Sequence, residues 1–472
     1  MPGHRFDRSI LRQYDIRGRW GHTLGPRDAW ALGRSFAEVV RRAGGSRVAV
    51  GRDGRLSSLE LEQALVLGLS EGGVDIARIG LCPTPVMYYA VASAEDVHGG
   101  IEVTGSHNPK DHNGFKMDLG GQPFFGDDIG ELGRIALAGA WTTPPRAGRI
   151  DRIDLNPAYI ARIVEALDGI DPRVIEPWRI GWDAGNGAAG PVIERLVRHL
   201  PGQHILFHTH ADGHFPNHHP DPSVAENLRD LIAAVAAGKI DFGFAFDGDG
   251  DRLALVDGHG RIVWGDRLLL ILARDLLARR PGARIMADVK SSQLVFDGVA
   301  ALGGTALIAP TGHSLIKSGM KRTGAVLAGE LTGHLFFADD FHGVDDALYA
   351  ALRLLAAAAR AGTTLTALAD TIPPMHATPD LRLACGANDP ATALRAVTDA
   401  LTAEGMAFDA TDGARVATPD GWWLLRASNT EAMLTARAES ATEAGLARLL
   451  AELRARLARA GVHLDEGAGH GH

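Results

Sequence analysis

Short runs of apolar and β-branched residues alternate with longer amphipathic stretches through most of the chain. The short runs have the length and composition of buried strands, and the longer stretches repeat with the period of a helix. This alternation indicates α/β units built on mixed or parallel sheets. Strands are expected at 47–51, 76–79, 100–103, 179–182, 240–246, 284–287 and 324–328, and helices at 26–43 and 86–92. Another helix is expected to be capped by Ser57 and to end near Gly72.

A coarse repeat groups these elements into three similar blocks. In each block an Asp-bearing loop follows one strand, and a polar loop with glycines follows a later strand. Ligands bind beyond the carboxyl ends of strands in open α/β sheets, so the three blocks are expected to point their loops into one central cleft. The paired loops are 52–55 with 104–109, 183–187 with 247–252, and 288–292 with 329–334.

The last hundred residues follow a different pattern. Helix-like stretches at 390–404 and 441–460 flank short strands at 421–425 and 433–438, which indicates an α+β domain. A chain of 472 residues is also too long for a single core. We therefore predict three similar α/β domains with mixed sheets and a C-terminal α+β domain, over residues 1–152, 153–257, 258–372 and 373–472.

Composition narrows the function classes. The content of 46% hydrophobic and 22% charged residues is typical of a globular protein, and the longest apolar run, 268–272, is far too short to span a membrane. A net charge of −9 argues against a general nucleic-acid or membrane surface. Cys82 and Cys385 lie far apart in apolar surroundings, which favours buried thiols and a cytoplasmic location. We expect a monomer or a weak dimer.

The strand at 100–103 runs into Thr104-Gly105-Ser106-His107-Asn108-Pro109. Glycine and proline bracket a serine here, so the chain turns sharply and is expected to present Ser106 exposed at the end of a strand. A serine on such a rigidly supported loop can act as a nucleophile or carry a phosphoryl group. An ordinary capped turn remains the alternative, because Ser, Asn and Gly are common turn residues.

Asp247-Gly248-Asp249-Gly250-Asp251 carries the strongest chemical signal in the chain. Three carboxylates at alternate positions, with glycines that let the backbone curl, suit a hard divalent cation such as Mg²⁺. An EF-hand is excluded, because its sixth and twelfth positions would be Arg252 and Gly258 instead of Gly and Glu. A polar turn without a cation is disfavoured, because three neighbouring carboxylates repel one another.

Two further loops suit a sugar phosphate. The segment 426–430 offers a guanidinium group, two hydroxyls and an amide for a phosphate, although a surface turn is equally compatible. The segment 329–334 offers groups for sugar hydroxyls, with a buried polar turn as the alternative. His313 and His334 are candidate proton carriers by residue type. Taken together, these loops meet the needs of phosphoryl transfer, which are positioning and charge neutralisation.

With these motifs in order, the chain resembles the α-D-phosphohexomutases, and most of all the bacterial phosphomannomutase/phosphoglucomutase branch. The likeness runs from Tyr14-Asp15-Ile16-Arg17-Gly18 to Arg426-Ala427-Ser428-Asn429-Thr430. The segment 104–109, followed by Asn113-Gly114-Phe115-Lys116, resembles the phosphoserine loop of this family. The family's metal, sugar and phosphate loops are matched by 247–252, 330–334 and 426–430, and the segment 215–222 also resembles this branch.

The resemblance implies a fourth domain like the TATA-binding protein and reversible phosphoryl transfer between the 1- and 6-positions of hexose phosphates, either mannose or glucose. Ser106 would carry the phosphoryl group. Mg²⁺ would be held by Asp247, Asp249, Asp251 and an oxygen of phosphorylated Ser106. A hexose 1,6-bisphosphate would be the intermediate and activator.

The resemblance also implies roles for other side chains. Lys116 and His334 would handle protons, and Arg17 and Arg252 would line the transfer site with them. Thr332 stands where this branch often has Ser, so the hydroxyl is kept and a methyl group is added. Substrate-binding residues would be Tyr14, Lys290, His313, Glu330, Thr332, Arg426, Ser428, Asn429 and Thr430.

Three rival functions are open at this point. Another mutase, such as a phosphoglucosamine mutase, would differ in the sugar that it turns over. A non-catalytic sugar-phosphate binding protein is disfavoured by the presence of Ser106 and the three aspartates. A metal-dependent phosphatase would release phosphate instead of isomerising the sugar.

Overall fold

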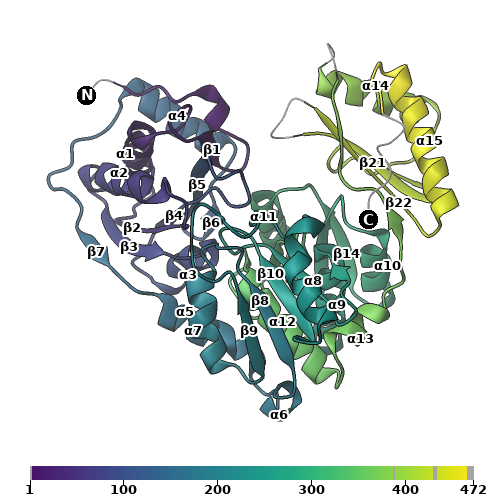
Figure 1. Ribbon diagram of the computed structural model, residues 1–472. Helices are drawn as coiled ribbons and strands as arrows, with labels where there is room; N and C mark the ends of the chain where they lie inside the picture. The colour runs from purple at the N-terminus through teal and green to yellow at the C-terminus, as the bar shows by residue number, and fades with distance from the viewer. Residues whose placement is uncertain (1–2, 386–388, 429–432, 465–472) are drawn as a thin grey trace.

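The computed structural model describes residues 3–385, 389–428 and 433–464, and it contains four β-sheets in four successive domains (Figure 1). The first three sheets mix parallel and antiparallel strands, whereas the fourth is antiparallel throughout. This confirms the predicted fold class. No helix among the described residues has the length and apolar character needed to cross a membrane.

The first domain is built on a sheet with the strand order β1-β5-β4-β2-β3-β7, and β6 pairs with β5. Every residue of β4 is buried, as expected for a strand that is covered on both faces. The elements are β1 Ile16–Arg19, α1 Pro26–Arg42, β2 Arg47–Arg52, α2 Ser58–Glu71, β3 Asp75–Leu81, α3 Thr84–Ser93, β4 Gly99–Val103, β5 His112–Leu119, β6 Gln122–Pro123, α4 Asp127–Ala138 and β7 Ile150–Arg152.

The second domain has a five-stranded sheet in the order β12-β11-β10-β8-β9. Its centre is β10, a run of buried residues that lies parallel to β8 and antiparallel to β11. The elements are α5 Asn156–Val164, α6 Pro172–Ile175, β8 Arg179–Asp183, α7 Gly190–Leu196, β9 Gln203–Phe207, α8 Arg229–Ala236, β10 Phe242–Phe246, β11 Leu253–Val256 and β12 Ile262–Val263.

The third domain has a five-stranded sheet in the order β14-β13-β15-β16-β17. Strand β15 lies parallel to β13 and antiparallel to β16, which repeats the pairing of β10 and of β4. The elements are α9 Gly265–Arg279, β13 Arg284–Asp288, α10 Gln293–Ala301, β14 Thr305–Ala309, α11 His313–Thr323, β15 Leu327–Gly329, β16 Leu335–Phe337, β17 Val344–Asp345, α12 Ala347–Arg360 and α13 Leu365–Asp370.

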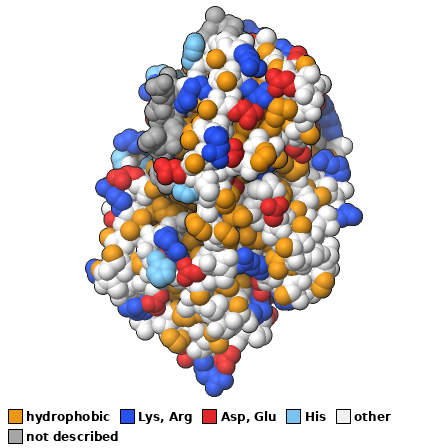
Figure 2. Space-filling model, turned by 90° about the vertical axis from the view of Figure 1, so that its right-hand side faces the viewer, with side chains coloured by type: hydrophobic (Ala, Val, Ile, Leu, Met, Phe, Trp, Pro, Cys, Tyr) orange, Lys and Arg blue, Asp and Glu red, His pale blue; other side chains and the backbone are white. Residues whose placement is uncertain are grey.

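The fourth domain stands apart at the upper right of Figure 1, opposite the first domain. Its sheet has the order β18-β22-β21-β20, and β19 also pairs with β22. Lysines and arginines are interspersed with acidic residues on the face of the molecule at this side (Figure 2). The elements are β18 His376–Ala377, β19 Leu381–Leu383, α14 Pro390–Ala403, β20 Ala414–Thr418, β21 Gly421–Ala427, β22 Leu434–Ser440 and α15 Glu443–Arg459.

One continuous hydrophobic core joins the second and third domains. It contains Trp182 and Phe244 of the second sheet together with Leu269 and Leu352 of the third domain. The same core also contains Val86 and Met87 of α3 in the first domain, which has a second core of its own, whereas the fourth domain has a separate core. The second and third domains are therefore held together by apolar burial, the main favourable term in domain association.

Two local predictions differ from the structure. Ser57 precedes α2 as expected, but it makes no capping hydrogen bond, because its backbone is already helical with φ −82° and ψ −15°. Its Oγ instead accepts a hydrogen bond from Asn113 Nδ2 at 2.8 Å. The strand expected at 324–328 begins only at Leu327, because Gly324 adopts a left-handed conformation that ends helix α11.

Candidate active site

Ser106 lies three residues beyond the end of β4, in a loop that the second domain covers. Its Oγ donates a hydrogen bond to Asp247 Oδ2 at 2.9 Å and lies 3.1 Å from His107 Nδ1. The expectation that Ser106 is exposed is wrong, because only 1% of the residue is accessible under the Asp247 loop. Its φ of +48° is unusual for a residue other than glycine, and such backbone strain concentrates at functional sites.

Asp53 and Arg55, which follow β2, hold the Ser106 loop in place. Asp53 Oδ2 accepts hydrogen bonds from Thr104 Oγ1 at 2.8 Å and from the backbone N–H of Gly105 at 3.0 Å. Arg55 Nη2 donates to the carbonyl oxygen of Ser106 at 2.7 Å, and its guanidinium also bonds three other carbonyls of the loop. No sequence motif marked this role, although the repeat predicts the Asp-bearing loop at 52–55.

Asp247, Asp249 and Asp251 follow β10 and are fully buried. Lys116 of β5 pairs with Asp249 at 2.6 Å and also with Asp251. Burial raises the pKa of Asp247 well above its usual value, and the two neighbouring carboxylates raise it further. Burial would raise the pKa values of Asp249 and Asp251 as well, yet both are lowered because Lys116 lies beside them.

Glycine at position 248 allows the acidic loop to meet the serine loop. A Cβ atom added to Gly248 would lie 2.4 Å from the carbonyl oxygen of Ser106, which is closer than real Cβ contacts come. Thr84, at the start of α3, also reaches this point and donates from Oγ1 to Asp249 Oδ2 at 2.6 Å. Three separate segments therefore meet at the acidic loop, and the role of Thr84 was not found from the sequence.

The acidic loop fits a divalent cation. One ligand oxygen from each of Asp247, Asp249 and Asp251 lies within 4.8 Å of the others. The Oδ1 atom of Asp249 is buried and has no hydrogen-bond partner, and Asp251 Oδ1 lies 3.2 Å from His334 Nε2. Carboxylate oxygens in this number leave positions for water or phosphate oxygens, which is how Mg²⁺ is usually held.

His334 follows β15 and lies between the acidic loop and the expected sugar loop. Its Nδ1 is 2.5 Å from Glu330 Oε2, and its Nε2 is 3.2 Å from Asp251 Oδ1. Burial alone would lower the pKa of His334, but Asp251 and Glu330 raise it to about 9 against the opposing charge of Arg252. Arg252 Nε is 3.3 Å from His334 Nε2, so the two expected transfer-site residues are adjacent.

His313 stands near His334, with 5.7 Å between the ring centroids. Burial and the nearby lysines Lys317 and Lys116 lower the pKa of His313 well below its usual value. Asp345 lies beside both histidines and accepts a hydrogen bond from Lys317 Nζ at 3.0 Å. Asp345 and Lys317 join the group through folding alone, and no local motif in the sequence marked them.

Arg17 and Tyr14 connect the first domain to this site. Arg17 Nη1 donates to the carbonyl oxygen of Gly105 at 2.6 Å, and its Nε pairs with Asp15 at 2.7 Å. Tyr14 Oη donates to the carbonyl oxygen of Thr311 at 2.9 Å, across to the third domain. The structure thus places Arg17 against the serine loop and Tyr14 at a contact between domains.

The sugar-loop residues are partly engaged by the protein. Glu330 Oε1 accepts a hydrogen bond from the backbone N–H of Gly312 at 2.7 Å, so both carboxylate oxygens of Glu330 have partners. Thr332 is half-buried and lines a cavity of about 250 Å³ between the third and fourth domains. Asp380 and Arg437 line the same cavity.

Lys290 and Arg426, which are both expected to bind phosphate, lie close to Asp380. Lys290 Nζ pairs with Asp380, and Arg426 Nε pairs with Asp412 Oδ2 at 2.9 Å. Burial would raise the pKa of Asp380, but Lys290 and the nearby arginines, Arg426 among them, lower it. Ser428 follows β21, while Asn429 and Thr430 lie outside the described residues.

Loops from the first three domains meet at Ser106 and the acidic triad, and the fourth domain brings Arg426 towards Lys290. Three α/β domains with these loops and an antiparallel fourth domain define the phosphohexomutase class of enzymes. Four family models match the chain in order, described as phosphoglucomutase/phosphomannomutase α/β/α domains I, II and III and the C-terminal domain. The matches cover residues 8–138, 157–260, 264–375 and 381–456.

Whole-chain relatives agree with these models. The phosphoglucomutase of Neisseria gonorrhoeae is 40% identical over 94% of this chain and 95% of its own length. The phosphomannomutase/phosphoglucomutase of Pseudomonas aeruginosa is 39% identical over 95% of each chain. The chain therefore belongs to the phosphoglucomutase/phosphomannomutase family and is a phosphohexomutase.

Solved structures show the same fold. A phosphoglucomutase/phosphomannomutase family protein from Burkholderia thailandensis matches with a TM-score of 0.90 and 41% identity, over 96% of this chain and 98% of its own. An N-acetylphosphoglucosamine mutase from Aspergillus fumigatus, solved with GlcNAc-6P and magnesium, shares the fold with a TM-score of 0.63 and 14% identity over 96% of each chain. At that identity the second likeness concerns the fold alone.

Proposed function

We propose that this enzyme moves a phosphoryl group between the 1- and 6-positions of glucose and mannose phosphates, and that Ser106 carries the group between the two steps. The observation that supports this most directly is the hydrogen bond from Ser106 Oγ to Asp247 Oδ2 at 2.9 Å. It sets the only serine hydroxyl of the loop against the three carboxylates that suit Mg²⁺.

In the first step the bond between phosphorus and Ser106 Oγ breaks, and a bond forms to the free hydroxyl of the sugar phosphate. The hydroxyl loses its proton and Ser106 Oγ, the leaving group, takes one up, and Lys116 and His334 are the candidates for carrying these protons. The product is a hexose 1,6-bisphosphate. Its other phosphoryl group then returns to Ser106 after the sugar has turned in the site.

The residues of the chain would prepare this transfer. Asp247, Asp249 and Asp251 would hold Mg²⁺, which when bound neutralises negative charge on the transferring group. Arg17 and Arg252 would add positive charge at the same place. Arg17 and Arg55 also fix the serine loop through their hydrogen bonds to its carbonyl oxygens, so the geometry is set before substrate binds.

Other residues would hold the sugar phosphate. Glu330 and Thr332 would bind hydroxyls that glucose and mannose share, and the position of Glu330 beside His334 supports this. Arg426, Ser428 and Lys290 would bind the phosphate that is not reacting. Arg426 is now paired with Asp412, so phosphate binding would exchange one anionic partner for another. Asn429 and Thr430 are proposed for the same role from the sequence.

The test is the variant Ser106→Ala. We expect it to fold normally and to lose turnover by at least about 10⁴-fold, because the group that carries the phosphoryl is gone. The measurements are intact mass, which should show a phosphorylated fraction only in the unchanged enzyme, and rates with mannose, glucose and glucosamine phosphates. Ser93→Ala, which removes the hydroxyl of an exposed serine at the end of α3, serves as the control and should keep both the phosphorylated fraction and the turnover.

Full turnover by Ser106→Ala would exclude the phosphoserine mechanism. Faster turnover of glucosamine phosphate than of glucose or mannose phosphate would indicate a phosphoglucosamine mutase. Net release of phosphate without isomerisation would indicate a phosphatase.

A further inference from the structure

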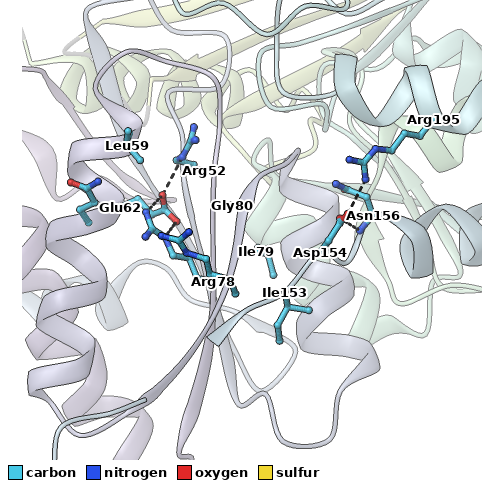
Figure 3. A pocket seen from close by; sticks show the side chains of 12 residues that line it. Arg52, Leu59, Glu62, Arg78, Ile79, Gly80, Ile153, Asp154, Asn156 and Arg195 are labelled. Atoms are coloured by element: carbon cyan, nitrogen blue, oxygen red, sulfur yellow. Dashed lines mark hydrogen bonds and ion pairs between the residues drawn. The ribbon is translucent and has the colours of Figure 1, made fainter. Parts of the chain in front are cut away.

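A second pocket lies between the first and second domains, away from the acidic triad. It has a volume of about 540 Å³ and is lined by residues of β2, α2 and β3, of β7 and the segment that follows it, and of α5 and α7. Figure 3 shows Arg52, Arg78 and Glu62 on one side and Arg195, Asp154 and Asn156 on the other. Ile79 and Ile153 lie between the two groups.

The pocket has an excess of positive charge. Glu62 is fully buried and is shared by two arginines, with contacts of 2.6 Å to Arg78 Nε and 3.1 Å to Arg52 Nε. On the other side Arg195 pairs with Asp154 at 2.9 Å. Four arginines thus face two carboxylates, in a chain whose overall net charge is −9.

Arg152 is the unbalanced member of the group. It pairs in register with Arg78 on the neighbouring parallel strand, and it has no ion-pair partner among the described residues. Like charges on adjacent strands are unfavourable, because the side chains lie close together. An anion bound between the strands would remove this repulsion.

The remaining lining describes the rest of a ligand. Asn156 Oδ1 is buried and has no hydrogen-bond partner, so it can accept a hydrogen bond from a hydroxyl group. Leu59 is 45% exposed although it is apolar, and with Ile79 and Ile153 it provides a hydrophobic wall. A volume of about 540 Å³ is within the range of small-molecule sites and exceeds the needs of a single inorganic ion.

We propose that this pocket binds a phosphorylated small molecule, at a site separate from the active site. A phosphate ester carries close to two negative charges near neutral pH, which matches the excess charge of the lining, whereas a single carboxylate carries one. The planar guanidinium groups can bind phosphate oxygens in pairs. The hydroxyl acceptor and the apolar wall would contact the organic part.

Amide hydrogen exchange can locate a ligand in this pocket, because Arg52 lies in a strand that is hydrogen-bonded within the first sheet. Arg52 pairs with Val103 at the end of β4, and Arg52 Nη1 donates to the backbone carbonyl of Asp53 at 3.2 Å. The other wall is formed by the segment that follows β7. We therefore expect a bound ligand to slow amide hydrogen exchange in residues 50–63 and 150–156.

The experiment is calorimetric titration of the full-length enzyme with pyrophosphate at low salt and without Mg²⁺, in parallel with hydrogen exchange. We expect Arg152→Glu to weaken the binding at this pocket at least tenfold and to remove the protection of both segments. Arg149→Glu makes the same charge change three residues earlier, at a side chain that is 68% exposed and outside the pocket. It should leave affinity and protection nearly unchanged.

Arg195→Gln gives a second reading from the opposite wall and should also weaken binding, while circular dichroism checks that each variant is folded. Citrate, titrated in the same way, separates phosphate from carboxylate recognition and should bind more weakly. The proposal is overturned if Arg152→Glu and Arg149→Glu bind pyrophosphate alike, if protection appears only around the Ser106 loop, or if citrate binds as well as pyrophosphate. Mutase turnover is not part of this readout, so the result is independent of the proposed mechanism.

Discussion

At the scale of single residues, a buried aspartate at the end of a strand supports a loop in each of the three α/β domains. Asp53, Asp183 and Asp288 each end or follow the first strand of a pair and accept hydrogen bonds from a polar loop. Asp53 bonds the serine loop, Asp288 bonds the backbone N–H of Leu331 in the sugar loop at 3.2 Å, and Asp183 lies 3.0 Å from His218 Nε2. A buried carboxylate can hold several N–H and O–H groups at once, which suits it to order a loop.

The variant Asp53→Asn tests whether the buried aspartate orders the serine loop. Asparagine keeps the shape but loses the charge that pairs with Arg55 at 3.2 Å, and its amide nitrogen cannot accept a hydrogen bond. We expect the free energy of unfolding to fall by about 3 kcal/mol, because a buried ion pair is broken. Turnover should fall by about 10²-fold, since a serine displaced by roughly 1 Å reacts poorly.

Urea unfolding and steady-state rates provide the measurements for Asp53→Asn. Asp297→Asn on the exposed face of α10 is the control, because its single hydrogen bond to Gln293 lies in solvent. Equal stability and turnover for the two variants would mean that Asp53 does not order the serine loop.

The acidic triad leads to a second prediction at this scale. We expect Asp249→Asn to raise the Mg²⁺ concentration needed for half-maximal turnover and to lower the maximal rate by about 10²-fold or more, because one carboxylate that neutralises charge is lost. Titrating Mg²⁺ back into enzyme treated with a chelator measures both. An unchanged dependence on Mg²⁺ would place the cation elsewhere.

At the scale of elements, α12 contains a titrating group at its start. Asp346 caps this helix by accepting a hydrogen bond from the backbone N–H of Tyr349, and Tyr159 of α5 also donates to its carboxylate. Burial raises the pKa of Asp346 to about 7, with the neighbouring charge of Asp345 acting in the same direction. Between pH 3.8 and about 7, the folded protein therefore keeps a proton on Asp346, whereas the unfolded chain has lost it.

The sign of the resulting pH dependence follows from that difference. The contribution of Asp346 to stability is fully present below the usual pKa of 3.8 and is lost as the pH rises through about 7. It amounts to at most about 4 kcal/mol. We expect Asp346→Asn to remove this part of the pH dependence, because the amide stays neutral and its oxygen can still cap the helix.

Urea unfolding at pH 5 and pH 8 measures the effect. The stability of the unchanged enzyme relative to Asp346→Asn should be lower at pH 8 than at pH 5, and the exposed control Asp340→Asn should behave like the unchanged enzyme. Identical pH dependence of the enzyme and Asp346→Asn would show that Asp346 is ionised in the folded state.

At the scale of the whole molecule, the second and third domains share one core, and the fourth is attached to them by polar contacts and by a small apolar cluster of Val289, Trp422 and Leu424. Arg415 of β20 donates to the carbonyl oxygens of Val289 and Ser291, at 2.5 Å and 2.9 Å, and packs on Trp422. Glu439 accepts a hydrogen bond from Ser292 Oγ at 2.8 Å. Polar contacts and a small apolar cluster can rearrange more readily than the large core that the second and third domains share, so movement of the fourth domain is expected.

We predict that the fourth domain closes on bound substrate, which would exclude water from the transfer. Small-angle scattering should show a smaller radius of gyration with saturating hexose phosphate than without it. Ser106→Ala should still close, because it keeps the phosphate-binding groups, whereas Arg426→Ala should not. A radius that does not change in the unchanged enzyme would rule out closure as the basis of water exclusion.

The sequence alone determined the parts of the site that follow directly along the chain. Apolar runs predict buried strands, and a loop that follows a strand must lie at the carboxyl end of that strand. Ser106, Asp247 to Asp251 and Glu330 could therefore be placed correctly relative to their own strands. The chemistry of the acidic loop could also be predicted, because alternating Asp and Gly residues rarely serve a purpose other than cation binding.

Only the tertiary structure decided which of these groups meet. Ser106 and Asp247 are 141 positions apart, and Lys116 and Asp249 are 133 apart, so their contacts depend on how two separately folded sheets dock. The same docking buries Ser106, brings Thr84 and Asp345 to the site, and places Arg195 of the second domain in the same pocket as Arg78 and Arg152. The sequence determines which residues are neighbours along the chain, whereas packing and charge at the domain surfaces determine which distant residues come into contact.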